Sequence, residues 1–110
     1  MEQTEIDNML QEAKKYDAEK YLAEAVKLLK RNKKIDIEIA DCEWFVVANK
    51  LILKIIYSVN GHAIVLRVVE QVFKDYQRQI DAKIGIKPGM EMKHKIILRL
   101  AYLLYTHRED

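Results

Sequence analysis

The segment Asp41–Val59, with the sequence DCEWFVVANKLILKIIYSV, decides the fold that the sequence predicts. On a helical projection its apolar residues cover almost every face, and Glu43, Lys50 and Lys54 form only a narrow polar strip. A helix of that kind must be surrounded by other protein or by lipid. Lys50 and Lys54 interrupt the apolar run well short of the ~18 residues that a membrane span needs. We therefore expect a central core helix and no membrane segment.

Turn-forming residues are scarce, which favours long helices over a multi-strand sandwich. The 110 residues include only three glycines and one proline. Asn60-Gly61 has the residue types of a left-handed helix stop. Helices over about 36–59 and 61–83 would then form a central antiparallel αα-hairpin. The prediction is a single all-α domain over residues 1–110, a four- to five-helix bundle.

Three boundaries within this bundle have specific signals. The apolar stripe of the first helix changes face, so that either the helix breaks near Tyr16–Asp17 or its halves pack on different partners. Ile35–Ile39 alternates like a strand; we favour helix from about Asp36, with a short edge strand as the alternative. Pro88-Gly89 predicts a type II turn, with a minor hairpin near 84–93 as an option. The last helix is expected over about Met90–His107.

The apolar residues of the two central helices define the expected core. Trp44, the only tryptophan, falls on a helical stripe and is placed in the central packing. The third helix should bury one amphipathic face. That face comprises Val65, Leu66, Val69, Val72, Phe73, Tyr76 and Ile80.

The sequence offers no recognisable catalytic or metal-binding pattern. The histidines and Cys42 are far apart, without C-x-x-C or H-x-x-x-H spacing, and Glu91–His94 is a single E-x-x-H pair. Serine and threonine occur only at Thr4, Ser58 and Thr106, outside any activating loop. No glycine-rich phosphate loop is present. We expect no enzyme activity, no cofactor and no metal, and no motif points to a known family.

The single cysteine indicates a reducing compartment. One thiol excludes an internal disulfide, and the acidic N-terminal segment has no apolar signal-peptide core. These features predict a cytoplasmic protein. Asp41 and Glu43 flank Cys42 and would raise its pKa, so we interpret it as a small buried residue.

Basic residues in the second half of the chain are the strongest binding signal. Residues 1–43 carry 8 Lys/Arg and 11 Asp/Glu, whereas residues 44–110 carry 11 and 6. On the expected third helix, basic and amide residues share the face opposite the core, and further cations surround Pro88. Such a surface could follow a phosphate backbone; the alternative is a solvated face on which Glu70 and Asp81 pair with the cations. The candidate nucleic-acid residues are Arg67, Gln71, Lys74, Arg78, Lys83, Lys87, Lys93, Lys95 and Arg99.

Two functions follow as expectations. The predicted helices carry more apolar surface than a four-helix monomer buries. We therefore expect a non-catalytic helical-bundle protein that acts through protein–protein contacts, as a homo-oligomer (a dimer in the simplest case) or as an accessory subunit. The alternative is binding of DNA or RNA through the basic residues.

Overall fold

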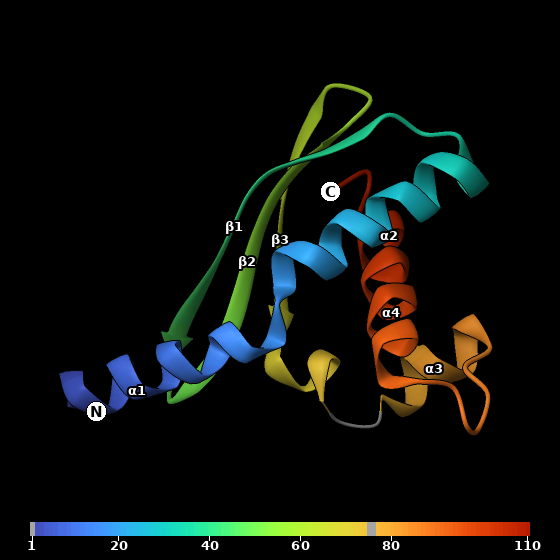
Figure 1. Ribbon diagram of the computed structural model, residues 1–110. Helices are drawn as coiled ribbons and strands as arrows, with labels where there is room; N and C mark the ends of the chain where they lie inside the picture. Colours follow the sequence, from blue (N-terminus) through green and yellow to red (C-terminus); the bar gives the residue numbers. More distant parts are fainter. Residues whose placement is uncertain (1, 75–76) are drawn as a thin grey trace.

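The chain folds as a three-stranded antiparallel sheet with helices before and after it. The computed structural model describes residues 2–74 and 77–110 (Figure 1). Two helices, α1 (Gln3–Ala13) and α2 (Ala18–Lys33), precede the sheet. The strands, in spatial order, are β1 (Ile37–Val47), β2 (Lys50–Val59) and β3 (His62–Val69). Helices α3 (Arg78–Ile84) and α4 (Met92–Thr106) follow, and short 3₁₀ helices lie at Lys14–Tyr16 (η1) and Glu70–Phe73 (η2).

The predicted all-α bundle is therefore wrong, and the error lies in the segment from which it was inferred. The expected helix over 36–59 is a β-hairpin of β1 and β2. On β2, Leu53, Ile55 and Tyr57 are buried, while Ile52 and Ile56 are apolar on the opposite face. A strand that is apolar on both faces resembles a helix that is apolar all round, and periodicity alone does not separate them. The many valine and isoleucine residues within 36–59 were the signal that favoured strands.

Both hairpins close with two-residue turns of the same kind. Ala48 and Asn49 have φ of 51° and 64°, and Asn60 and Gly61 have φ of 51° and 84°. Positive φ at both central residues is the type I′ geometry, whose twist matches that of paired strands. Asn-Gly flanked by alternating hydrophobic residues is the strongest short hairpin signal; because the same dipeptide also stops helices, the sequence alone favoured a helix end here.

The expected third helix over 61–83 is also wrong. It is replaced by β3, η2 and α3, with Tyr76 outside the described residues. Of the residues assigned to its apolar face, Leu66, Val72 and Phe73 are buried. Val65 and Val69 point instead to the other face of the sheet, because strand side chains alternate.

The segment 84–93 forms no minor hairpin. Residues 85–91 form the loop between α3 and α4, and Ile84, Met92 and Lys93 belong to these helices. The Met90 N–H donates to the Lys87 carbonyl at 3.3 Å, and Gly89 has φ 85°. This confirms the turn at Pro88-Gly89 and excludes the strands on either side of it.

Two predictions near the chain ends are confirmed. The first helical region breaks at Asp17, whose φ is 50°, so that α2 takes a different direction from α1 (Figure 1). The last helix matches the expected range to within two residues at its start and one at its end. The alternative of a strand near Ile35–Ile39 is confirmed in part, because β1 begins at Ile37.

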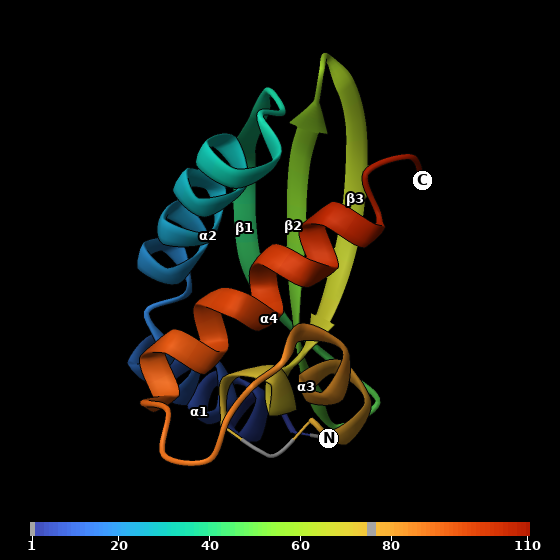
Figure 2. The same ribbon diagram turned by 90° about the vertical axis from the view of Figure 1, so that its right-hand side faces the viewer.

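One face of the sheet forms the core. Helices α2 and α4 both cover this face (Figure 2). Leu22 and Leu29 of α2 and Leu100 and Leu104 of α4 are buried against it. The Tyr57 hydroxyl donates to the Leu104 carbonyl at 2.9 Å, which fixes α4 to the middle strand.

Trp44 packs against this core from a strand and not from the predicted helix. Its ring centroid lies 5.6 Å from that of Tyr16 and 5.4 Å from that of Phe73. Trp44 is half-buried. The three rings join β1, η1 and η2 at one end of the sheet.

Candidate functional site

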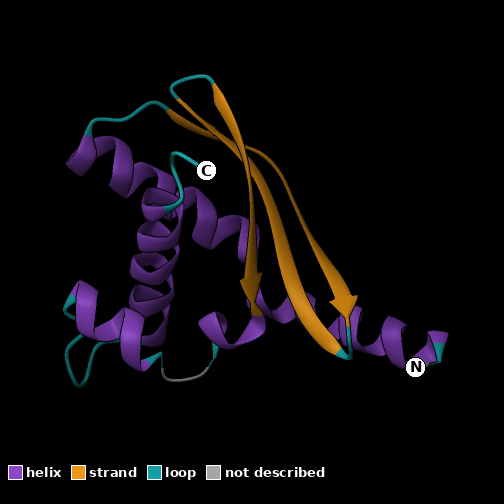
Figure 3. Ribbon diagram, turned by 180° about the vertical axis from the view of Figure 1, so that it is seen from behind, coloured by secondary structure: helices purple, strands orange, loops and turns teal. Residues whose placement is uncertain are grey.

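The second face of the sheet carries no helix across it. Seen from behind, α2, α3 and α4 lie on one side of the strands, and α1 passes the end of the sheet (Figures 1 and 3). We call the other side the open face. Strand alternation, with the pairing register of β1 shifted by one residue between Ile39 and Asp41, assigns its side chains: Glu38, Asp41, Glu43, Phe45 and Val47 of β1, Lys50, Ile52, Lys54, Ile56 and Ser58 of β2, and Ala63, Val65, Arg67 and Val69 of β3.

The open face holds most of the exposed apolar surface. Five large apolar side chains are exposed within residues 2–74 and 77–110, and four of them lie here. They are Phe45 (39%), Val47 (58%), Val65 (49%) and Val69 (44%). Isolated exposed apolar residues are common, whereas a contiguous patch marks an interaction surface.

A charged row crosses this apolar patch. Glu43 stands opposite Lys54, and Lys54 opposite Arg67. The next row consists of Phe45, Ile52 and Val69. Opposite charges face each other across β1 and β2, which is favourable, whereas the like charges of Lys54 and Arg67 face each other across β2 and β3, which is not. Lys54 Nζ also lies 5.8 Å from the centroid of the Phe45 ring, within cation–π range.

The two rows surround a shallow hollow of about 490 Å³. Its cationic border is Lys54 and Arg67, and its remaining lining is apolar. The acidic side chains Glu38, Asp41 and Glu43 all lie on β1, at the opposite edge of the open face from Arg67. The open face therefore has carboxylates on one edge strand and cations on the other two strands, with apolar side chains between them.

The structure does not assemble the predicted basic stripe. Arg67 is on the open face of β3, whereas Gln71 is exposed in η2 and Arg78 begins α3. Lys74 follows η2 and pairs with Glu70, Nζ to Oε1, at 3.6 Å. Because these residues occupy three elements, the shared helix face that was expected does not exist.

The second predicted cluster is divided as well. Lys83 is on α3, Lys87 is in the following loop, and Lys93 and Lys95 are at the start of α4. Lys93 pairs with Glu91 at 3.6 Å. Arg99 is not a surface residue, since only 1% of it is exposed. It forms an ion pair with buried Asp81 and so belongs to the core.

The described part of the chain holds no group of three or more His, Cys, Asp or Glu side chains placed to bind a metal ion. His62 Nε2 contacts the Asp110 carbonyl at 2.8 Å, and His107 Nδ1 contacts the Asp110 carboxylate. None of the helices within residues 2–74 and 77–110 has the length and apolar character to cross a membrane.

Comparison with protein-family models, with curated proteins and with solved structures finds no significant match. Function is therefore argued from the surfaces of this chain. Sequence reasoning missed Phe45, Val47 and Ile52 as surface residues because a helical projection placed them in a core. No apolar/polar alternation marks them, because Val46 and Leu51 beside them are also apolar; the β-branched residues of the segment were the signal for strands.

Proposed function

We propose that this is a non-catalytic protein that acts through protein–protein contacts, and that two copies associate through the open face. The observation that supports this proposal is the exposed apolar patch of Phe45, Val47, Val65 and Val69 beside a row of opposite charges. When a second sheet packs on an uncovered apolar sheet face, at a spacing of about 10 Å, the burial of apolar surface stabilises the complex.

The charge pattern of the open face favours one arrangement of the two copies. A two-fold axis parallel to β2 lays β1 over the partner's β3, with Glu43 facing Arg67 of the partner subunit. Phe45 then meets Val69 of the partner subunit. An axis across the strands would lay β1 on β1 and bring the acidic residues together, which costs free energy. Self-complementarity under a two-fold axis is the normal geometry of a homodimer.

This arrangement places two lysines of β2, Lys50 and Lys54, near their own copies. The long Lys54 side chain can turn its ammonium toward Glu43 of its own sheet or over Phe45, while its methylenes stay in the interface. The 5.8 Å contact with the Phe45 ring already has that direction. The repulsion is therefore smaller than that between two fixed charges.

The size of the face indicates a reversible dimer. β1 has 11 residues, or about 36 Å at standard rise, and three strands span roughly 14 Å. Each copy would bury on the order of 500 Å², less than the ~800 Å² per partner of a typical stable complex. We expect a dissociation constant in the micromolar range.

A pair of glutamate substitutions tests the proposal. Val69 and Met92 are exposed to the same extent, 44% and 43%, but only Val69 lies on the open face. We expect Val69→Glu to shift the sedimentation coefficient at micromolar concentration to that of a monomer, and Met92→Glu to leave the dimer intact. A parent protein that stays monomeric at such concentrations contradicts the proposal.

Nucleic-acid binding is the second candidate. It is favoured by the exposed Phe45 ring, with Lys54 and Arg67 around the same hollow, since aromatic faces and cations bind single strands. The acidic residues of β1 oppose it. A mobility assay with a labelled oligonucleotide at low salt tests it, and Arg67→Glu should abolish any shift.

The free thiol of Cys42 is in keeping with our proposal that the protein acts in the cytoplasm.

A further inference from the structure

β1 is an edge strand whose outer side is unpaired. The sheet order is β1-β2-β3, and within residues 2–74 and 77–110 β1 pairs only with β2. Val47 and Lys50 close a two-residue hairpin and so form a hydrogen-bonded pair. Counting back along β1, Glu43 and Phe45 direct their backbone groups to β2. Cys42, Trp44 and Val46 direct theirs outward, away from the sheet.

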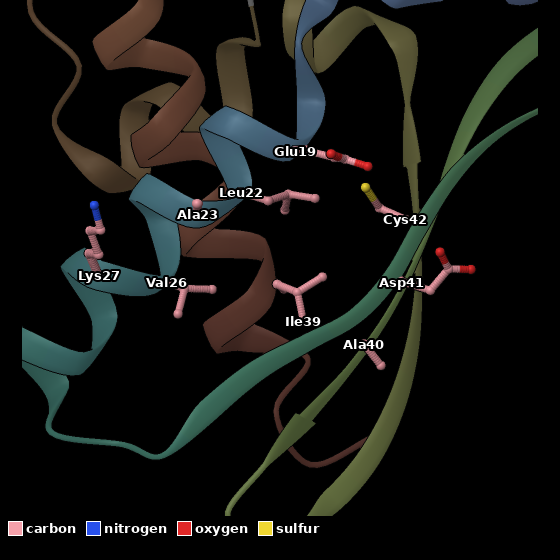
Figure 4. Close-up of a pocket in the computed structure, with 9 residues that line it drawn as sticks. All are labelled: Glu19, Leu22, Ala23, Val26, Lys27, Ile39, Ala40, Asp41 and Cys42. Carbon is pink, nitrogen blue, oxygen red and sulfur yellow. The ribbon is translucent and has the colours of Figure 1, made fainter.

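A groove follows this edge between β1 and α2 (Figure 4). It has a volume of about 470 Å³, and its apolar lining includes Leu22, Val26 and Ile39. A second hollow of about 230 Å³ shares Glu19 and Cys42 with the first and continues to Trp44. The two hollows together run along β1 from Ile39 to Trp44, about five to six residues of an extended chain.

The two sides of β1 at this edge differ in chemistry. In Figure 4, Leu22, Glu19 and Cys42 point into the space between α2 and β1, whereas Asp41 points away from α2. Glu38 and Glu43 lie on the same open face as Asp41, and all three are exposed. A strand beside β1 would therefore meet a mainly apolar groove, with Glu19 and Lys27 in its lining, on one side and a row of carboxylates on the other.

We propose that an extended segment of a partner protein adds to β1 as a fourth strand. Its backbone pairs with the outward groups of Cys42 and Trp44. Its apolar side chains enter the groove, and its alternating lysine or arginine side chains face Glu38, Asp41 and Glu43. Strand addition of this kind takes affinity from the backbone hydrogen bonds and specificity from alternate side chains.

The charges of β1 argue against a second copy at this edge. Antiparallel pairing of β1 with β1 would set acidic side chains opposite acidic side chains, which is destabilising. A basic extended segment would instead place opposite charges beside these carboxylates, which is stabilising. This edge shares the open-face side chain of Glu43 with the proposed dimer interface, but the groove and the outward backbone groups of β1 lie outside that interface, and the inference does not rest on the proposed dimer.

Cys42 provides a reporter inside the groove. Burial raises the pKa of its thiol, and the negative charges of Glu19 and Asp41 raise it further. It is the only cysteine in the chain, so that a maleimide labels one position. A bound segment should slow this labelling because it covers the thiol.

The test uses the fluorescein-labelled peptide Lys-Val-Lys-Ile-Lys-Val-Lys. Two control peptides carry the same fluorescein label. The block peptide has the same residues with the three apolar ones placed next to each other, and the acidic peptide has Glu in place of every Lys. We expect the alternating basic peptide to bind with saturable anisotropy, and both controls to bind at least tenfold more weakly. Ala23→Trp, which fills the groove from exposed Ala23, should weaken binding at least tenfold. Arg31→Trp, exposed on α2 outside the groove, should not.

Hydrogen exchange distinguishes strand addition from other binding. Saturating peptide should slow exchange of the Cys42 and Trp44 amides and leave the Glu43 amide, already paired with β2, unchanged. Three results would overturn the inference: no saturation up to millimolar peptide, equal binding of the block peptide, or undiminished binding by Ala23→Trp. Concentration-dependent protection of the Cys42 and Trp44 amides without peptide would overturn it too, since a second copy would then hold the edge.

Discussion

Arg99 of α4 donates two parallel hydrogen bonds to the carboxylate of Asp81 in α3, Nε to Oδ1 and Nη2 to Oδ2, each 2.8 Å long. Its remaining nitrogen, Nη1, donates to the Val72 carbonyl in η2 at 3.1 Å. Arg99 and Asp81 are 1% and 4% exposed. The paired charges therefore hold α3, α4 and η2 together inside the protein.

Removing one partner of this pair should destabilise the fold strongly. Arg99→Met leaves the Asp81 carboxylate buried without compensation, and we expect a loss of about 3–5 kcal/mol in the free energy of unfolding. The double variant Arg99→Met/Asp81→Leu should recover most of that loss, because no charge remains buried. Urea unfolding followed by circular dichroism measures both. As a control, Glu24→Gln breaks an exposed pair with Lys27 and should leave the midpoint unchanged.

The Arg99–Asp81 pair also predicts how the free energy of unfolding changes at low pH. Hydrogen bonds from Arg99 are the main cause of a lowered Asp81 pKa, and they outweigh the opposing effect of burial. The folded pKa is thus below the unfolded value of about 3.9. The stabilisation is present above that unfolded value and is lost as pH falls through the folded pKa. Unfolding measured between about pH 5 and pH 2 should show a smaller acid-induced loss for Asp81→Asn than for the parent.

Tyr57 predicts a loss of stability on the alkaline side. Burial, followed by the charge of Asp110, raises its pKa to about 12, above the unfolded value of about 10. The neutral hydroxyl is therefore favoured in the fold, and its stabilisation is present below about pH 10 and lost as pH rises toward 12. Tyr57→Phe should remove this dependence and cost about 1 kcal/mol at neutral pH, because the bond to Leu104 is lost. An absorbance titration in which every tyrosine ionises near pH 10 would contradict the assignment.

The ring cluster at the end of the sheet makes Trp44 a probe of packing. Its contacts with Tyr16 and Phe73 should shift its emission to shorter wavelength than that of free tryptophan. We expect Trp44→Ala to cost about 2–3 kcal/mol, near the lower end for such a change, because the side chain is only half-buried. Phe73→Leu should move the emission of Trp44 toward that of free tryptophan. Unchanged emission in that variant would show that the rings do not pack as described.

The sequence predicted the helical ends of the chain well and its middle wrongly. The change of apolar face predicted a helix break, which the structure has at Asp17. The apolar pattern of the last helix predicted α4. In β2, Ile52 and Ile56 are apolar on the face that no helix covers, so the alternation that marks a strand was hidden. The apolar side chains on the open face thus obscured the secondary structure.

The candidate site was less predictable, for a tertiary reason. Arg67 was named as a binding residue, but its neighbours in space are Lys54 across the ladder and Val69 on the same hollow. Arg99 looked like a surface cation because its partner Asp81 is 18 residues away in sequence. Pairings of this kind depend on the fold and have no local pattern.

Charge reversal across the open face tests the central claim most directly. The dissociation constant of the dimer is measured by sedimentation equilibrium for the parent, Glu43→Arg, Arg67→Glu and the double variant. We expect each single reversal to weaken association at least tenfold, because like charges then face each other across the two-fold axis, and the double reversal to restore it. Single and double variants that associate as tightly as the parent would contradict the proposed interface, as would a double variant weaker than both singles.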